Sequence, residues 1–341
     1  MKAFYISLMF IVATSALKSQ QKEGNPAENL PDYIKRVTQF GERADWSHDG
    51  KKILFIEKTY GDAYEIEIET GKIRLITGHF YHGGFTRALY LANGDVLLSG
   101  CTSFDAENPH VNRQVNAELW VLNKSYSTPP VRLGTKCSEG PAVSRKNMKI
   151  AWTIMFRQYP ELKKGQYLIQ TADIIYNNGI PELANKRLLV DNLETLGKDG
   201  EIESQNFVLP DEKFMTFSAY AYKGGEVMLL NLETGKVTPM TSGDERFEEC
   251  EGIFPDGKST CIERGTIPGT SDIWKLKLDG SGEAKRITWF NDYKGYRSSN
   301  PSISSDGRFM AFQMARTEDR AGVGYGIFVM DLEKAELQQQ K

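Results

Sequence analysis

The chain has 341 residues, of which 40% are hydrophobic and 26% charged, so it is long enough to bury a large core. Its formal net charge of −3 and the lack of any Lys and Arg cluster argue against a nucleic-acid partner. Length alone would allow two domains, but a pattern repeated from end to end favours one.

The chain begins with a segment typical of a secretory signal peptide. Lys2 precedes the apolar run 3–16, and small residues and then the polar stretch 18–29 follow it. The run is too short to span a membrane comfortably, and no Cys follows it to carry a lipid anchor. We therefore expect residues 1–19 to be a signal peptide, 20–31 a polar linker and 32–341 a single domain. The mature protein is expected to be secreted or periplasmic, without a membrane span.

After this leader, one pattern recurs six times: a polar loop, an alternating apolar strand, a turn and further strands. The first hairpin of each unit covers residues 45–55, 89–98, 142–152, 207–217, 253–262 and 302–312. The third strands are expected at 64–68, 118–122, 173–176, 227–232, 272–278 and 326–332, and the fourth at 73–77, 131–134, 187–190, 237–241 and 285–288. A repeat of roughly 40 to 55 residues made of short strands indicates blades around an axis, because one small sheet cannot bury both faces alone.

The sixth unit has no fourth strand of its own, only the polar tail 333–341. The segment 34–38, which precedes the first unit, is nearly the same phrase as the fourth strand of the fifth unit. We therefore predict that the N-terminal strand completes the last blade and leaves no open sheet edge. The expected fold class is all-β: a six-bladed β-propeller with four-stranded antiparallel blades, closed by the N-terminal strand.

Export would place the four cysteines in an oxidising compartment. Cys250 and Cys261 flank the hairpin turn 255–258, and Cys101 and Cys137 are expected near one rim of neighbouring blades. We predict the disulfides 101–137 and 250–261, although four cysteines allow three connectivities, and four free buried thiols are the alternative. Neither pair has the Cys-x-x-Cys spacing of a zinc or redox site.

The phrase Trp-Ser-x-Asp-Gly-Lys-Lys-Ile-x-Phe at residues 46–55, together with residues 304–312, resembles the WD40-like repeat of TolB-type β-propellers. The likeness covers nearly the whole chain after the leader, and a closing N-terminal strand is also what this family implies. Proteins similar in this way include periplasmic scaffold proteins, the propeller domains of prolyl oligopeptidases and secreted lyases that act on acidic polysaccharides. The motif encodes hairpin turns and blade packing, so it indicates architecture and not chemistry.

The resemblance suggests two enzymatic functions, and each of them requires particular residues. A prolyl oligopeptidase needs a Gly-x-Ser-x-Gly nucleophile elbow, which this sequence lacks. A lyase similar to oligogalacturonate lyase would need His and other metal ligands from late blades, whereas every His of this chain lies in its first third. A metal site made of His79, His82 and His110 is a weak hypothesis, since no ligand spacing supports it and ordinary loop residues are the alternative. We expect no cofactor, with a divalent metal as the less favoured alternative.

The mouth of the central channel is the remaining candidate site. Counting back seven positions from each turn glycine, or its equivalent, marks a ring of positions: Arg43, Arg87, Gly140, Gln205, Cys250 and Asn300, with Glu139, Glu203 and Glu251 beside them. Arginine presents a planar fork suited to carboxylate or phosphate, so such a ring could bind a polar or charged ligand. The predicted ligand-binding residues are Arg43, Arg87, Glu139, Gln205, Glu251 and Asn300. The alternative is that these groups satisfy one another.

These features favour a monomeric binding or scaffolding module whose ligand is a protein or a polar or acidic oligosaccharide. The alternative is a carbohydrate-active lyase or hydrolase, metal-assisted in one version. In that case Arg43, Arg87, Glu139 and Glu251 would supply ion-pair and acid–base groups. No motif of the sequence identifies a catalytic residue.

Overall fold

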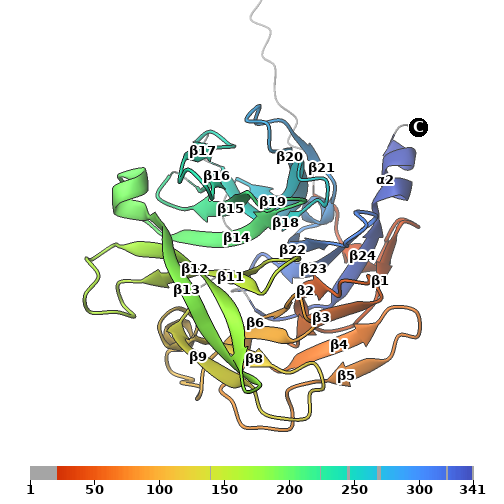
Figure 1. Ribbon diagram of the computed structural model, residues 1–341. Helices are drawn as coiled ribbons and strands as arrows, with labels where there is room; N and C mark the ends of the chain where they lie inside the picture. Colours follow the sequence, from red (N-terminus) through yellow and green to blue (C-terminus); the bar gives the residue numbers. More distant parts are fainter. Residues whose placement is uncertain are drawn as a thin grey trace, which may run out of the picture.

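The computed structural model describes residues 21–138, 140–222, 224–243, 246–266, 270–319 and 322–339. The expected signal peptide lies outside these residues. The described strands form six four-stranded antiparallel sheets arranged around a common axis (Figure 1). The predicted fold class, a six-bladed β-propeller, is thereby confirmed. Within the described parts of the chain, no helix is long and apolar enough to cross a membrane.

In the first five blades, the chain runs from the innermost strand to the outermost. The inner strands are β2 (Glu42–Trp46), β6 (Phe85–Tyr90), β10 (Ala142–Val143), β14 (Ile202–Val208), β18 (Phe247–Ile253) and β22 (Tyr296–Ile303). The second strands are β3 (Lys52–Ile56), β7 (Val96–Gly100), β11 (Lys149–Met155), β15 (Phe214–Ala219), β19 (Ser259–Gly265) and β23 (Phe309–Arg316). The third are β4 (Ala63–Glu67), β8 (Glu118–Leu122), β12 (Tyr167–Asn177), β16 (Glu226–Asn231), β20 (Ser271–Lys277) and β24 (Ile327–Asp331). The outer strands are β5 (Ile73–Leu75), β9 (Val131–Lys136), β13 (Ile180–Asp191), β17 (Val237–Pro239), β21 (Ala284–Arg286) and β1 (Ile34–Arg36).

The N-terminal strand closes the ring, as predicted. β1 is the outer strand of the last blade and pairs antiparallel with β24, with Ile34 opposite Met330 and Arg36 opposite Phe328. The hydroxyl of Thr38 extends this pairing, because it accepts a 2.9 Å hydrogen bond from the amide of Ile327, 289 positions away. The edge of β24 is therefore covered by a segment from the opposite end of the chain.

The repeated Ser-x-Asp-Gly phrase forms the turn between the two inner strands of a blade. In the first blade, the Ser47 hydroxyl donates to the Asp49 carboxylate at 2.7 Å and accepts from the Lys52 amide at 2.9 Å. Gly50 takes the positive φ of 68° that the turn requires and that other residues rarely adopt. The last blade repeats this arrangement around Ser304. Local side-chain bonding thus explains why the phrase recurs.

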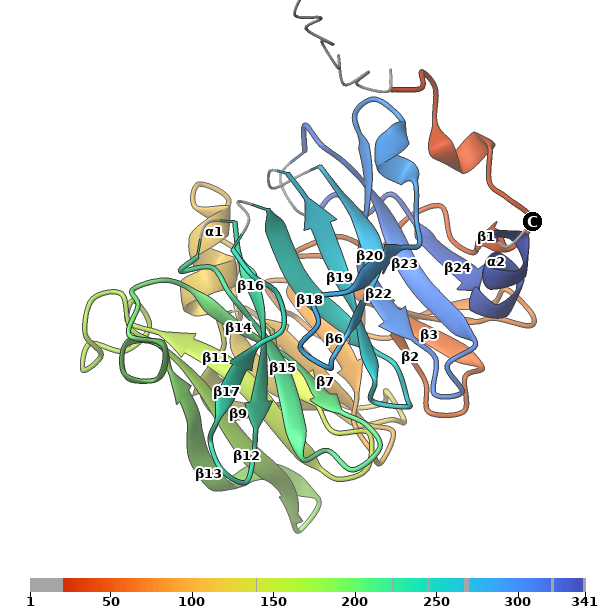
Figure 2. The same cartoon turned by 90° about the horizontal axis from the view of Figure 1, so that it is seen from above.

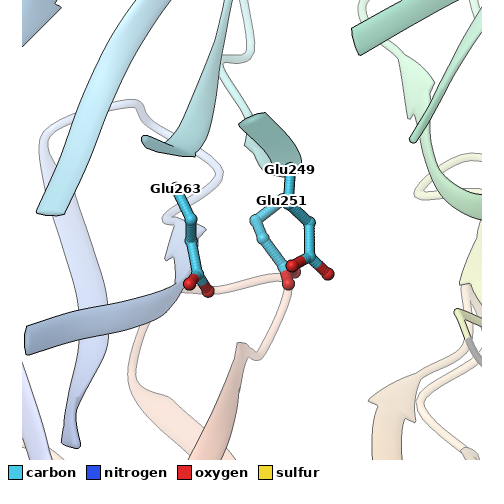
Figure 3. Close-up of side chains that lie close together, drawn as sticks. All are labelled: Glu249, Glu251 and Glu263. Atoms are coloured by element: carbon cyan, nitrogen blue, oxygen red, sulfur yellow. The ribbon is translucent and has the colours of Figure 1, made fainter. Parts of the chain in front are cut away.

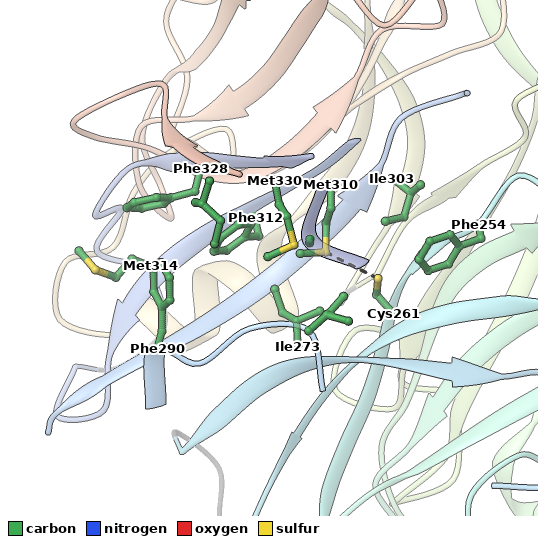
Figure 4. Close-up of a cluster of buried hydrophobic side chains, with 13 residues drawn as sticks. Phe254, Cys261, Ile273, Phe290, Ile303, Met310, Phe312, Met314, Phe328 and Met330 are labelled. Atoms are coloured by element: carbon green, nitrogen blue, oxygen red, sulfur yellow. Dashed lines mark hydrogen bonds between the residues drawn. The ribbon is translucent and has the colours of Figure 1, made fainter. Parts of the chain in front are cut away.

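The hydrophobic core lies between the blades, because each sheet presents one apolar face to each neighbour. Between the fifth and sixth blades, the largest cluster includes Phe254 and Cys261 on one side and Met310, Phe312 and Phe328 on the other (Figure 4). These side chains are almost fully buried. Removing one of the buried aromatic rings would cost about 3–5 kcal/mol, so the blades stabilise one another and not themselves alone.

Two polar terminal segments pack against the last blade. Lys22 forms a β-bridge with Tyr293, and the 3-10 helix η1 (Pro26–Glu28) follows it. The tail expected to be only polar forms helix α2 (Leu332–Gln339), whose first turn is capped by the Asp331 carboxylate. Figure 2 shows these two terminal segments on the same side of the ring, and Gln338 donates to Asp32 at 2.6 Å. The sequence did not reveal this packing.

The third blade carries a longer outer hairpin than the sequence indicated. The expected third and fourth strands, 173–176 and 187–190, are parts of β12 and β13, which pair along almost their whole length. Asn178 and Gly179 form the turn between them, with φ of 49° and 82°. Asn-Gly is a strong hairpin signal, but the exposed half of this hairpin is too polar for its strands to show alternating apolar residues. The remaining helical turns lie in loops: α1 (Pro109–Val111), η2 (Asn112–Asn116), η3 (Asn192–Leu196) and η4 (Phe290–Asp292).

Neither predicted disulfide is present, and all four cysteines are buried thiols. Cys250 lies opposite Ile262 in the ladder between β18 and β19. The preceding residue of β19, Cys261, therefore points to the other face of the sheet, since side chains alternate along a strand. The thiol of Cys101 donates instead to a backbone carbonyl of η2 at 2.9 Å, and Cys137 packs in the cluster between the second and third blades.

Candidate functional site

Two cavities lie between the inner strands of the propeller. One, of about 430 Å³, is lined by apolar side chains such as Trp46 and Phe207 and equally by polar ones such as Arg145 and Gln205, and we call it the mixed cavity. The other, of about 310 Å³, is lined by charged side chains and is called the charged cavity; its lining includes Glu42, Arg43, Glu249, Glu251, Glu263, Arg297 and Asn300. The two cavities share Glu251 and Asn300, so they lie next to each other in the channel.

Bulges in the inner strands bring polar side chains to these cavities. The ladder between the first two strands is interrupted in blades 1, 2, 4, 5 and 6, and the extra residues include Arg43, Gln205, Glu251 and Asn300. Arg43 and Asn300 have φ of 57° and 49°, a left-handed conformation uncommon for residues other than glycine. The corresponding residue of blade 3 is Gly140, with φ of 58°. A bulge turns the strand locally and re-aims its side chain, here toward the channel.

The structure brings together five of the six residues that the sequence marked as ligand-binding. Arg43 lines the charged cavity, Arg87 and Gln205 line the mixed cavity, and Glu251 and Asn300 line both. The Arg87 guanidinium lies 3.8 Å from the Glu251 carboxylate, and the Asn300 amide lies 3.5 Å from it. The sixth residue, Glu139, lies outside the described residues. The role of this group in ligand binding stays a prediction.

The three histidines of the weak metal hypothesis do not form a group of possible metal ligands among the described residues. The ring of His82 lies 3.0 Å from the Asp62 carboxylate and accepts the Gly84 amide at 2.9 Å. His79 lies 3.4 Å from a backbone carbonyl in a different loop, and His110 is exposed on α1. His79 and His82 share the loop between β5 and β6, whereas His110 lies between β7 and β8, and the bonds of His79 and His82 are to other groups.

The structure reveals a cluster of carboxylates that the sequence analysis had only partly identified. Glu249 and Glu251 of β18 and Glu263 of β19, here called the glutamate trio, point toward one another (Figure 3), with oxygen atoms within 4.8 Å. Among the described residues, it is the one group of three His, Cys, Asp or Glu side chains that could hold a metal ion. Side chains alternate along a strand, so residues 248–251 alone could have placed Glu249 and Glu251 on one face. Glu263 joins them only through the strand register, which sets it opposite Glu249.

Hydrogen bonds from Asn300 fix part of the trio. The backbone amide and the side-chain amide of Asn300 both donate to Glu263, at 2.8 and 3.0 Å. The hydroxyl of Ser271 donates to the second oxygen of Glu263 at 3.2 Å, and the Arg297 guanidinium lies 3.6 Å from it. Glu263 is therefore held between β20 and β22, in a fixed position for a ligand of the channel.

The electrostatics of the trio are dominated by burial and by like charge. Burial raises the pKa of Glu249 well above its ordinary value, and the neighbouring carboxylates of Glu203, Glu251 and Glu263 raise it further. Burial also raises the pKa of Glu251, to about 8, although Arg87 acts in the opposite direction. Tyr220, which donates to Glu203 at 3.2 Å, completes this side of the channel. Burial and the neighbouring carboxylates thus disfavour ionisation of Glu249 and Glu251.

Several buried polar atoms that line the two cavities have no hydrogen-bond partner within the described protein. They are Gln205 Nε2, Arg297 Nε, Ser299 Oγ and Asn300 Oδ1. A buried donor or acceptor left without a partner costs about 1–3 kcal/mol. Native proteins rarely keep several such atoms in one place without a ligand or water to satisfy them. These atoms can therefore bind water or a polar ligand that enters the channel.

No family model matches the chain, and no curated protein matches it. Solved structures do. A gluconolactonase from Xanthomonas campestris has a TM-score of 0.57 at 10% identity, over 87% of this chain and 89% of that one. An oligogalacturonate lyase in complex with manganese has a TM-score of 0.51 at 10% identity, over 89% and 79%. TolB from Acinetobacter baumannii has a TM-score of 0.45 at 15% identity, over 85% and 67%.

The chain has the fold of a six-bladed β-propeller, which it shares with the gluconolactonase and the oligogalacturonate lyase. At 10% identity, the likeness shows the fold alone. The function of the channel therefore has to be argued from its own residues.

Proposed function

We propose that the protein is a binding module that takes a polar, anionic ligand into the mouth of its central channel. The observation that carries the proposal is the group of unsatisfied buried atoms: Gln205 Nε2, Arg297 Nε, Ser299 Oγ and Asn300 Oδ1. They include both donors and acceptors, and they line cavities that share residues. We also propose that the protein is exported to a secreted or periplasmic location and that its mature form is a single domain of residues 32–341. This part of the proposal rests on the N-terminal sequence.

An oligosaccharide that carries carboxylates fits this lining best. Hydroxyl groups both donate and accept, so they match the closely spaced atoms of Ser299 and Asn300. Arg43 and Arg297 line the charged cavity and Arg87 lines the adjoining one, and their planar guanidinium groups can receive a carboxylate. The volume of about 310 Å³ is at the small end of ordinary ligand sites, which suits the end of a chain more than its middle.

The test begins with a thermal-shift screen of acidic and neutral oligosaccharides, followed by calorimetric titration of the best ligand. In the double variant Arg43→Ala/Arg87→Ala, affinity should fall by at least about a hundredfold, because each charge-assisted hydrogen bond contributes about 1.5–3 kcal/mol. The matched control is Arg74→Ala/Arg187→Ala, which removes the same charge from exposed positions on outer strands.

Circular dichroism should show that both double variants are folded. Unchanged affinity in the channel variant would contradict the proposal, as would equal losses in the two variants, which would indicate only long-range attraction. If acidic oligosaccharides give no shift while an acidic protein segment binds, the ligand class is wrong.

One observation favours a second function, carbohydrate cleavage. The oxygen atoms of Glu249, Glu251 and Glu263 lie within 4.8 Å of one another, and paired carboxylates on either side of a glycosidic bond are the usual catalytic groups of glycoside hydrolases. The test is to search for product after incubating wild-type protein with each oligosaccharide that binds. Turnover that Glu251→Gln abolishes without weakening binding would favour the enzyme. Binding without turnover would favour the module.

A further inference from the structure

We propose that the glutamate trio, together with Ser299 and Asn300, forms a binding site for a hard divalent cation, with Ca²⁺ the preferred ion. This inference goes beyond the proposed ligand-binding function, since the cation needs no other ligand to bind. It rests on the position of the donors, on an unpartnered buried hydroxyl beside them and on the charge around them.

The spacing of the carboxylates suits a single ion. All three side chains reach the same point from two paired strands (Figure 3), with their oxygen atoms within 4.8 Å of one another. Oxygen ligands bind Ca²⁺ at about 2.3–2.6 Å, so two ligands on opposite sides of the ion are roughly 5 Å apart. The trio can therefore surround one such ion without a large movement of the backbone.

A second observation, independent of the carboxylates, points to the same place. Ser299 is 1% exposed, its hydroxyl has no hydrogen-bond partner in the described protein, and it lines the charged cavity together with the trio. The carbonyl oxygen of Asn300 also has no partner, although its amide nitrogen donates to Glu263 at 3.0 Å. Carboxylate, hydroxyl and amide oxygens without nitrogen or sulfur form a donor set for hard ions such as Ca²⁺, Mg²⁺ or Mn²⁺, not for Zn²⁺.

The charge around the trio leaves room for a cation. The Arg87 guanidinium lies 3.8 Å from Glu251, and the Arg297 guanidinium lies 3.6 Å from Glu263. Both distances exceed the length of a hydrogen bond. Glu263 accepts three hydrogen bonds from Asn300 and Ser271, which leaves a lone pair of its carboxylate for an ion. Glu249 has the carboxylates of Glu203, Glu251 and Glu263 as its neighbours. A divalent ion would replace this repulsion with attraction.

The site is also open to an entering ion. Glu249 is only half-buried and lines the charged cavity, whereas Glu251 and Glu263 lie deeper. A hydrated cation can therefore meet Glu249 first and exchange its waters for the deeper ligands.

The experiment titrates chelator-treated protein with CaCl₂ alone, and then with MgCl₂ or ZnCl₂, by calorimetry and thermal shift. We expect one Ca²⁺ per chain and a higher melting temperature with Ca²⁺. In Glu249→Gln and in Ser299→Ala, the affinity for Ca²⁺ should fall by at least about tenfold. The control is Asp319→Asn, which removes the same charge as Glu249→Gln from the same cavity but lies outside the trio.

A second readout separates a cation site from a merely structural role. In the presence of chelator, Glu249→Gln should melt at or above the wild-type temperature, because the neutral amide cannot add to the negative charge of the trio, and only its response to Ca²⁺ should be lost. Absence of saturable Ca²⁺ binding would overturn the proposal, and so would an equal loss in Asp319→Asn or tighter binding of Zn²⁺ than of Ca²⁺. Titrating the oligosaccharide in chelator tests the ligand proposal separately, so the two can fail independently.

Discussion

Glu65 is a buried carboxylate between the first two blades that is stabilised by hydrogen bonds. Its buried carboxylate, 7% exposed, accepts hydrogen bonds from Tyr90 at 2.7 Å, Tyr126 at 3.0 Å and the Lys52 ammonium at 2.8 Å. Burial opposes its ionisation, but these three donors together outweigh burial and lower the pKa of Glu65 below its ordinary 4.5. A lowered pKa in the folded state stabilises the fold above pH 4.5, and this stabilisation is lost as the pH falls through the folded-state pKa.

We therefore predict that Tyr90→Phe reduces the free energy of unfolding by about 1–3 kcal/mol at neutral pH, because the carboxylate loses a buried donor. The difference from wild type should shrink as the pH falls below 4.5, where Glu65 becomes protonated. Urea denaturation at a series of pH values measures both effects. Tyr81→Phe is the control, because Tyr81 is 87% exposed. An equal loss for Tyr90→Phe at pH 3 and pH 7 would show that packing, not the charged hydrogen bond, is responsible.

The cysteines are a second case at the residue scale. Burial raises the pKa of the Cys101 thiol to about 11, and it also raises the pKa values of Cys250 and Cys261. Reaction requires the thiolate, so these thiols should be unreactive in the folded protein. We predict that a thiol reagent labels the native protein slowly, that four thiols react after denaturation, and that reducing agent leaves the melting temperature unchanged. A melting temperature that falls in reducing agent would reveal a disulfide.

At the scale of elements, the most consequential strand is also among the shortest. β1 has three residues, yet it covers the edge of β24 and adds Ile34 to the core cluster of the last two blades. Without it, β24 would present unpaired backbone groups on an exposed apolar sheet, which favours pairing with other chains. The helix α2 packs nearby but cannot replace these ladder bonds.

We predict that deleting residues 32–39 abolishes cooperative unfolding or causes aggregation, as measured by calorimetry and size-exclusion chromatography. A matched deletion of residues 21–28 removes the same number of residues, including η1, but leaves β1 in place. It should have a smaller effect. A monomeric protein without residues 32–39 that melts within about two degrees of the parent would contradict the role of β1, since loss of even 1 kcal/mol shifts the melting temperature by about 2–4 °C.

At the scale of the whole molecule, the ring creates the candidate site. Arg43, Arg87, Gln205, Glu251 and Asn300 come from five blades, and each is placed at or beside a bulge of its inner strand. No single blade contains a binding site. The channel joins their side chains only because six similar sheets close around one axis.

The sequence by itself determined the repeat, the six-bladed fold, the closing strand and the channel position of these five residues. Such features follow from local signals, namely turn glycines, alternating apolar residues and a constant distance from turn to strand start. Only the tertiary structure decided that Glu263 meets Glu249, that Cys250 and Cys261 lie on opposite faces of their sheet, and that the three histidines stay apart. These outcomes depend on strand register and on the packing of distant segments, where a shift of one residue reverses every side chain and no local pattern records the choice.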